Sequence, residues 1–215
     1  YLADDTRAAL AAKPHFPPPE GIAAEAYFAQ LQSASGYPGP VSHDLGFGIK
    51  RHYQIFSGGY SSFIVEGVSA DDKLASVTTL LSHSLPSKDP EGERKLGELW
   101  KSLLGASVNT RWAYAPGAER VKATLQKALG PQAEVAVPPE LAEAYDALMS
   151  PRATLSLGPP CPPNTSPLLG RAQTDALVRA GRYDLLRNVL RGPNPEGRIY
   201  AAVELAQHPP VQDDD

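Results

Sequence analysis

Apolar and polar residues alternate from residue 49 to residue 82, with the period of two that is typical of half-buried strands. This alternation predicts strands at 49–55, 60–66 and 74–82. Gly58 and Gly59 favour a tight hairpin between the first two strands, because glycine adopts positive φ without steric cost. The polar segment 69–73 supplies the second turn. The pattern therefore predicts an antiparallel three-stranded meander.

A second group of elements follows, in which strand-like runs flank a helical segment. We predict a strand, a helix and a strand at 107–114, 116–129 and 133–137. Gly130 suits the end of that helix, and the spacing fits a right-handed β-α-β crossover. A helix at 138–149 and an edge strand at 153–157 are expected next. The predicted fold class is α+β, with the meander and the β-α-β unit joined in one mixed sheet and followed by a C-terminal helical module.

Three further helices are predicted at 3–12, 20–34 and 89–104. A capping aspartate and the propensity of alanine favour the first, and apolar residues at intervals of three and four favour the other two. The last begins with Asp89-Pro90-Glu91, which suits a helix start because the acidic side chains complement the positive end of the helix dipole. Its apolar stripe consists of Leu96, Leu99, Trp100, Leu103 and Leu104.

Prolines cluster in two segments, 13–20 and 158–167. Closely spaced prolines fix φ and favour an extended spacer over a packed element. We therefore divide the chain into four parts: an N-terminal helix with a proline-rich linker at 1–19, an α+β domain at 20–157, a second proline-rich linker at 158–166 and a helical module at 167–215.

The helical module contains three predicted helices, at 167–180, 183–191 and 195–207. Its last two helices carry more apolar residues than two short helices can hide from water alone. These residues are Leu185, Leu186, Val189, Leu190, Ile199, Val203 and Leu205. We expect them to pack partly against the 167–180 helix and partly against the α+β domain or a partner chain.

The two helical sequences Tyr183-Asp184-Leu185-Leu186-Arg187-Asn188-Val189-Leu190 and Pro193-Asn194-Pro195-Glu196-Gly197-Arg198-Ile199-Tyr200-Ala201-Ala202-Val203-Glu204-Leu205 follow each other closely. A short helix with leucines, a turn and a second helix rich in small residues resembles one unit of a HEAT-like helical repeat. The resemblance covers about residues 182–207, and no second copy recurs at a fixed period. It implies scaffolding and partner binding.

The composition indicates a globular protein, because 42% of the residues are hydrophobic and 20% are charged. A net charge of -4 argues against nucleic acid and anionic lipid as partners. Every apolar run is far shorter than the roughly 20 residues of a membrane-spanning helix, so we expect no membrane insertion. The single cysteine, Cys161, excludes an internal disulfide and a cysteine-rich zinc site.

Alanine and arginine are abundant whereas lysine, asparagine and isoleucine are sparse, a bias typical of GC-rich bacterial genomes. Cytoplasmic and exported locations both remain open, and the start at Tyr1 is compatible with a processed precursor or a truncated chain.

Reactive side chains are densest between His43 and Glu66. A hydrolase would need a serine, a histidine base and an orienting acid, for which the candidates are His43, Asp44, His52 and Ser61. The sequence around Ser61 does not match the G-x-S-x-G spacing of a nucleophile elbow.

A metal site would require His43, His52 or His83 to converge with a carboxylate at about 2.0 to 2.2 Å from one ion. Their separations match no metal-binding signature, and we predict no metal and no cofactor. Gly46-Phe47-Gly48 precedes two cations but lies in no phosphate-binding glycine pattern, so we interpret it as a strand entrance.

Our candidates for an interaction surface are Trp112 and the flanking Arg111 and Tyr114. The favoured function is that of a non-enzymatic adaptor, assembly or regulatory component that binds a protein partner. The alternatives are a hydrolase that uses the His43 to Glu66 region and a small-ligand-binding domain with an apolar pocket between sheet and helices.

Overall fold

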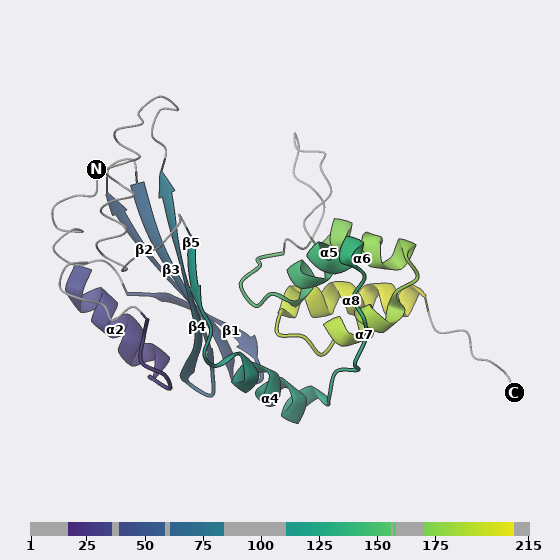
Figure 1. Ribbon diagram of the computed structural model, residues 1–215, viewed down its shortest axis with the longest axis horizontal. Coiled ribbons are helices and arrows are strands. Elements are labelled where there is room, and N and C mark those ends of the chain that lie inside the picture. Colours follow the sequence, from purple (N-terminus) through teal and green to yellow (C-terminus); the bar gives the residue numbers. More distant parts are fainter. Residues whose placement is uncertain are drawn as a thin grey trace, which may run out of the picture. The chain divides into compact units, whose positions relative to one another are not determined.

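A computed structural model describes residues 17–35, 39–58, 61–83, 111–155, 157 and 170–208. The chain divides into two compact units, which we treat separately. The sheet unit consists of Tyr1–Asp44 and Gly48–Val121, and the helical unit of Leu45–Phe47 and Lys122–Asp215. Both are drawn in Figure 1. The predicted α+β class and the predicted C-terminal helical part are confirmed.

The sheet unit is built on a five-stranded sheet in the order β1-β2-β3-β4-β5 (Figure 1). Its strands are β1 (Val41–Gly46), β2 (Ile49–Gly58), β3 (Ser61–Ala70), β4 (Lys73–His83) and β5 (Arg111–Tyr114). Strands β2, β3 and β4 pair antiparallel in chain order, which confirms the predicted meander. Strand β1 extends the meander at one edge and was not predicted, because most of its side chains are polar and exposed.

Tight turns fix the register of this sheet. Phe47 and Gly48 connect β1 to β2 with φ of 58° and 77°, and Asp71 and Asp72 connect β3 to β4 with φ of 50° and 60°. Two successive residues of positive φ are characteristic of the type I′ turn, whose twist matches that of the flanking strands. The Gly46-Phe47-Gly48 segment is thus part of a hairpin turn.

The predicted mixed sheet is wrong, because β5 pairs antiparallel with β4 and residues 133–137 form no strand. The Asn188 side chain forms hydrogen bonds with backbone groups that a neighbouring strand would otherwise pair with. The Asn188 amide donates to the carbonyl of Ala133 at 2.8 Å, and its oxygen accepts from the Ala133 N–H at 2.9 Å. Val135 and Val137 pack against the helical core. The alternation of apolar residues at 133–137 thus reflects the packing of Val135 and Val137 against helices, not pairing with another strand.

The predicted edge strand at 153–157 is also absent from the described residues of that segment. The amide of Asn194 donates to the carbonyl oxygens of Ser150 at 2.7 Å and Ala153 at 3.0 Å, and Leu155 is buried in the helical core. These contacts hold the segment against helices.

Helix α2 (Ala24–Ser35) lies beside the sheet and buries Tyr27, Phe28 and Leu31 (Figure 1). The Phe28 ring packs over Gly67 of β3, where an added Cβ would come within 2.8 Å of a ring carbon. Glycine is required there because no other side chain fits beneath the ring without displacing it.

The linker predicted at 1–19 is corrected at its end, because Pro18 is buried rather than solvated. Pro18 and Pro19 lie next to β4 and β5, where they line a groove. The helices predicted at 3–12 and 89–104 and the linker predicted at 158–166 lie outside the described residues.

The helical unit contains α5 (Pro139–Met149), α6 (Arg171–Arg179), α7 (Tyr183–Val189) and α8 (Pro195–Gln207), and α4 (Ala118–Leu129) runs into it from the sheet unit. The predicted helices of the C-terminal module are therefore present in its described residues. Leu141 and Leu148 of α5 share one core with Leu177, Leu185 and Leu186.

The packing of α5 corrects the predicted domain boundary. The division between units falls at Val121 and Lys122, not at 158–166, so α5 and the segment up to residue 157 belong with the C-terminal helices. The apolar residues of α7 thus pack partly against α5.

Candidate functional site

The four candidate catalytic residues do not form a common site in the described part of the chain. His43 and Asp44 are exposed on β1, whereas His52 is buried on β2. Ser61 lies at the start of β3, and its side chain is outside the described residues, as is that of His83. Of these candidates, His52 is the one whose side-chain hydrogen bonds the structure describes in detail.

His52 is 3% exposed, and both of its ring nitrogens take part in hydrogen bonds. Its Nδ1 lies 2.9 Å from Oγ of Ser42, and its Nε2 lies 2.9 Å from Oγ of Ser69. The imidazole also stacks on Phe28 of α2, with ring centroids 5.2 Å apart and an interplanar angle of 27°. We call these four residues the His52 cluster.

Burial lowers the pKa of His52, and the nearby Lys50 ammonium lowers it further, although Glu25 and Asp72 oppose this shift. The ring is therefore neutral at pH 7, with one nitrogen as donor and the other as acceptor. One serine hydroxyl accepts from the ring and the other donates to it. Such an arrangement satisfies a polar group in the layer between α2 and the sheet.

Sequence reasoning selected His52 but missed both of its serine partners. Ser69 lies two residues beyond Gly67, the residue that pairs with His52, and a register irregularity separates Val68 from Ser69. Ser42 comes from the unpredicted strand β1. Only the register of three strands identifies this cluster.

No group of three histidine, cysteine, aspartate or glutamate side chains within the described ranges could hold a metal ion. The described residues also contain no helix long and apolar enough to cross a membrane.

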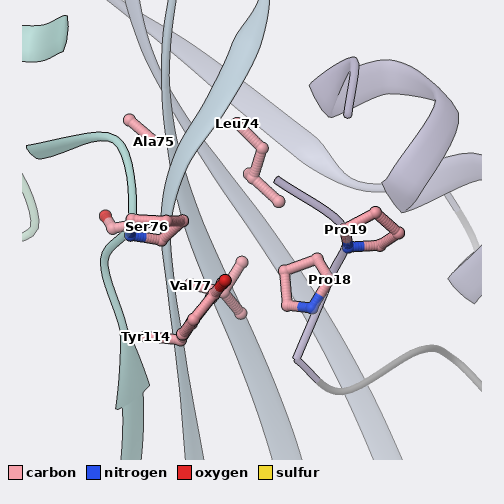
Figure 2. Close-up of a pocket in the computed structure, with 8 residues that line it drawn as sticks. Pro18, Pro19, Leu74, Ala75, Ser76, Val77 and Tyr114 are labelled. Atoms are coloured by element: carbon pink, nitrogen blue, oxygen red, sulfur yellow. The ribbon is translucent and has the colours of Figure 1, made fainter. Parts of the chain in front are cut away.

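A shallow groove lies on the sheet unit (Figure 2). It encloses almost no volume, whereas small-molecule sites enclose roughly 300 to 1,000 Å³. Its lining consists of Pro18, Pro19, Leu74, Ala75, Ser76, Val77, Tyr114 and Pro116. Tyr114, one of the candidate interaction residues, is half-buried there, and the side chains of Arg111 and Trp112 lie outside the described residues.

A short apolar row crosses three strands of the sheet. Ile55 pairs with Ile64, and Ile64 pairs with Leu80. Ile55 and Leu80 are 40% and 42% exposed, and Ile64 between them is half-buried. Neighbouring Tyr53 and Glu66 make the adjacent row polar, so the apolar surface is narrow.

The described residues of the helical unit show a second apolar surface, on α8. Its exposed positions Ile199, Ala202, Val203 and Ala206 follow the i, i+3, i+4, i+7 spacing of one helix face. Ile199 is 48% and Val203 is 43% exposed. We call these four residues the outer stripe.

Local contacts determine which face of α8 points outward. Asn194 caps the helix by accepting from the N–H of Gly197 at 3.0 Å, and Pro195 occupies the first turn. Gly197 lies so close to the Leu148 carbonyl oxygen that any Cβ would overlap it. The inner face of α8 is therefore anchored on α5.

The inner face of α8 even buries a charged residue. The Glu204 carboxylate lies 3.5 Å from the Arg171 guanidinium and 3.9 Å from the His208 imidazole, and its side chain is 7% exposed. Tyr200 and Ala201 are buried on this face as usual, but the burial of a glutamate and the exposure of Ile199 and Val203 depart from the usual amphipathic pattern. This departure makes the outer stripe the strongest candidate for a functional surface.

Comparisons with known protein families, with curated proteins and with solved structures found no match.

Proposed function

We propose that this protein is a non-enzymatic adaptor, assembly or regulatory component that binds another protein through the outer stripe of α8. The observation that carries the proposal is the exposure of Ile199 and Val203 next to two alanines on one helix face. Full burial of such side chains contributes about 1.5 to 3 kcal/mol each. Small neighbours allow a partner helix to approach closely.

The resemblance to a HEAT-like repeat supports the same proposal. In repeat proteins each unit buries its outer face against the next unit. Helices α7 and α8 provide one helix pair, with Leu185 and Leu186 inside and the outer stripe outside. A partner that supplies the neighbouring helix surface would complete this arrangement.

A photoreactive phenylalanine analogue at position 202, in the middle of the outer stripe, tests the proposal in the cells that make the protein. The matched control carries the same analogue at position 187, where Arg187 is exposed on α7. We expect a discrete protein adduct from position 202 that is absent from position 187. Identical adduct patterns at the two positions would refute binding through the stripe.

A second candidate function, hydrolysis, is favoured by one distance. Oγ of Ser42 lies 2.9 Å from Nδ1 of His52, within reach for general-base activation of a nucleophile. Labelling with a fluorophosphonate probe tests this candidate. Labelling that disappears in Ser42→Ala but persists in Ser69→Ala would support a hydrolase, and no labelling of the wild type would exclude Ser42 as its nucleophile.

A further inference from the structure

We propose that the His52 cluster is a pH-sensitive contact that holds strand β1 on the sheet, and that uptake of a proton by the His52 ring releases Val41–Asp44 from β2. All residues of the cluster belong to the sheet unit, so the inference is independent of the outer stripe. His52 lies on β2 and connects the strands on either side, because Ser42 of β1 and Ser69 of β3 each lie 2.9 Å from one ring nitrogen.

The two hydrogen bonds fit a neutral ring better than a charged one. A neutral imidazole has one donor and one acceptor nitrogen, so one serine hydroxyl accepts from the ring and the other donates to it. A protonated ring has two donors, and the serine that donated to the ring loses its acceptor. Ser69 is 1% exposed and His52 is 3% exposed, so a charge on the ring gains little hydration while β1 stays in place.

The charged groups around His52 compensate such a charge incompletely. Glu25 of α2 and Asp72 of the β3–β4 turn favour protonation, but burial and the Lys50 ammonium outweigh them, and the pKa of His52 is lowered. Asp72 is itself paired with Lys50, at 3.0 Å. On β1, Asp44 shares the face of Ser42 and is exposed. The ring nitrogens bond serines, so the carboxylates act on the ring only through space.

Strand β1 is the element that opens, because its first four residues bury the least apolar surface. Val41–Asp44 are all exposed, and Val41 is 54% exposed. Helix α2, on the same ring, buries three large side chains to 2% exposure or less: Tyr27, Phe28 and Leu31. Opening β1 therefore hydrates the charged ring at little cost in apolar burial, whereas lifting α2 is costly. Leu45 is 5% exposed, which keeps the other end of β1 in place.

Amide hydrogen exchange of the full chain, corrected for the intrinsic effect of pH on exchange, tests the proposal. Between pH 7.5 and pH 5.0 we expect at least a tenfold loss of protection at the amides of Val41–Asp44 that pair with β2, and no such loss in β3. His52→Gln keeps a donor and an acceptor but takes up no proton, so its protection should not change with pH. His43→Gln, at the exposed histidine of β1 itself, is the matched control and should behave like the wild type.

A second variant shifts the transition without removing a hydrogen bond of the cluster. Lys50→Gln removes the ammonium that opposes protonation, so protection should be lost at a higher pH than in the wild type. The Lys50 side chain is 39% exposed, so this variant should fold even if His52→Gln does not. Circular dichroism verifies the fold of each variant at both pH values.

Three results would overturn the proposal. The first is equal protection of Val41–Asp44 at both pH values in the wild type. The second is an equal loss of protection in the wild type and in His52→Gln, and the third is a transition in Lys50→Gln at unchanged or lower pH.

Discussion

The sheet unit and the helical unit differ in which side chains they bury and which they expose. The sheet unit contains the densest group of reactive residue types, but His52 is buried and held by Ser42, Ser69 and Phe28. In the helical unit the Glu204 carboxylate lies between the exposed Arg171 and His208 side chains, and the outer stripe of α8 is apolar. The comparison teaches that reactive residue types do not by themselves mark a functional site.

Both units use buried polar groups to hold irregular packing. The sheet unit uses His52, which can gain a charge, and the helical unit uses Asn188 and Asn194, which cannot, together with the buried Glu204. Substitution of these groups should therefore destabilise each unit, and His52 should make the stability of the sheet unit depend on pH.

Leu186→Ala should have the largest effect, a loss of about 2 to 5 kcal/mol in the free energy of unfolding of the helical unit. Leu186 is 0% exposed within the core shared by α5, α6, α7 and α8. Urea unfolding followed by circular dichroism measures the loss. Arg187→Ala, at the exposed neighbouring position, should change stability by less than about 0.5 kcal/mol. Equal effects of the two substitutions would contradict this account of the core.

Asn188→Ala should destabilise the helical unit by about 1 to 3 kcal/mol, because the backbone N–H and carbonyl of Ala133 lose their side-chain partner. Gln207→Ala removes an exposed amide in the same unit and is the matched control. Thermal unfolding compares the two variants. If Asn188→Ala behaved like its control, the side chain would not anchor the 133–137 segment.

Gly67→Ala should destabilise the sheet unit by about 1 to 3 kcal/mol, because the new methyl group displaces the Phe28 ring. Phe28→Leu in the same chain should reduce that cost, since the smaller side chain leaves room. Unfolding free energies of both single variants and the double variant form the cycle that measures this coupling. Strictly additive costs would show that α2 does not pack on Gly67.

A pH-dependent loss of stability, the smallest expected effect, should appear in the sheet unit. The folded pKa of His52 is lowered by burial, so its contribution is fully present above the unfolded pKa of about 6.5 and is lost as pH falls through the folded pKa. Wild type should therefore lose more stability than His52→Gln between pH 7.5 and pH 5.5. Urea unfolding at both pH values measures the difference, and parallel losses would show that His52 does not titrate with folding.

The elements predicted correctly are those in which the spacing of apolar residues follows directly from the burial of one face. Alternation identified β2, β3 and β4, and the intervals of three and four identified α5 to α8, because these patterns follow from one buried face. Strand β1 was missed because an exposed edge strand shows no apolar alternation. The segment 133–137 was misassigned because a period of two does not reveal whether the neighbour is a strand or the Asn188 side chain.

The outer stripe could not be predicted from the sequence for a similar reason. Ile199 and Val203 were expected to pack against another helix, the α+β domain or a partner chain because they are apolar. The contact of Gly197 with Leu148 and the pairing of Glu204 with Arg171 instead place the opposite face of α8 inside. Each depends on residues that are distant in the sequence.

The central claim is that the outer stripe is a binding surface and not part of the folded core. The free energy of unfolding of the double variant Ile199→Ser/Val203→Ser, measured at a protein concentration where the chain is monomeric, tests it most directly. Both side chains are partly buried in the monomer, so we predict a loss smaller than that of Leu186→Ala alone, which truncates a fully buried side chain. A loss as large as that of Leu186→Ala would show that both side chains belong to the folded core, and would contradict the claim.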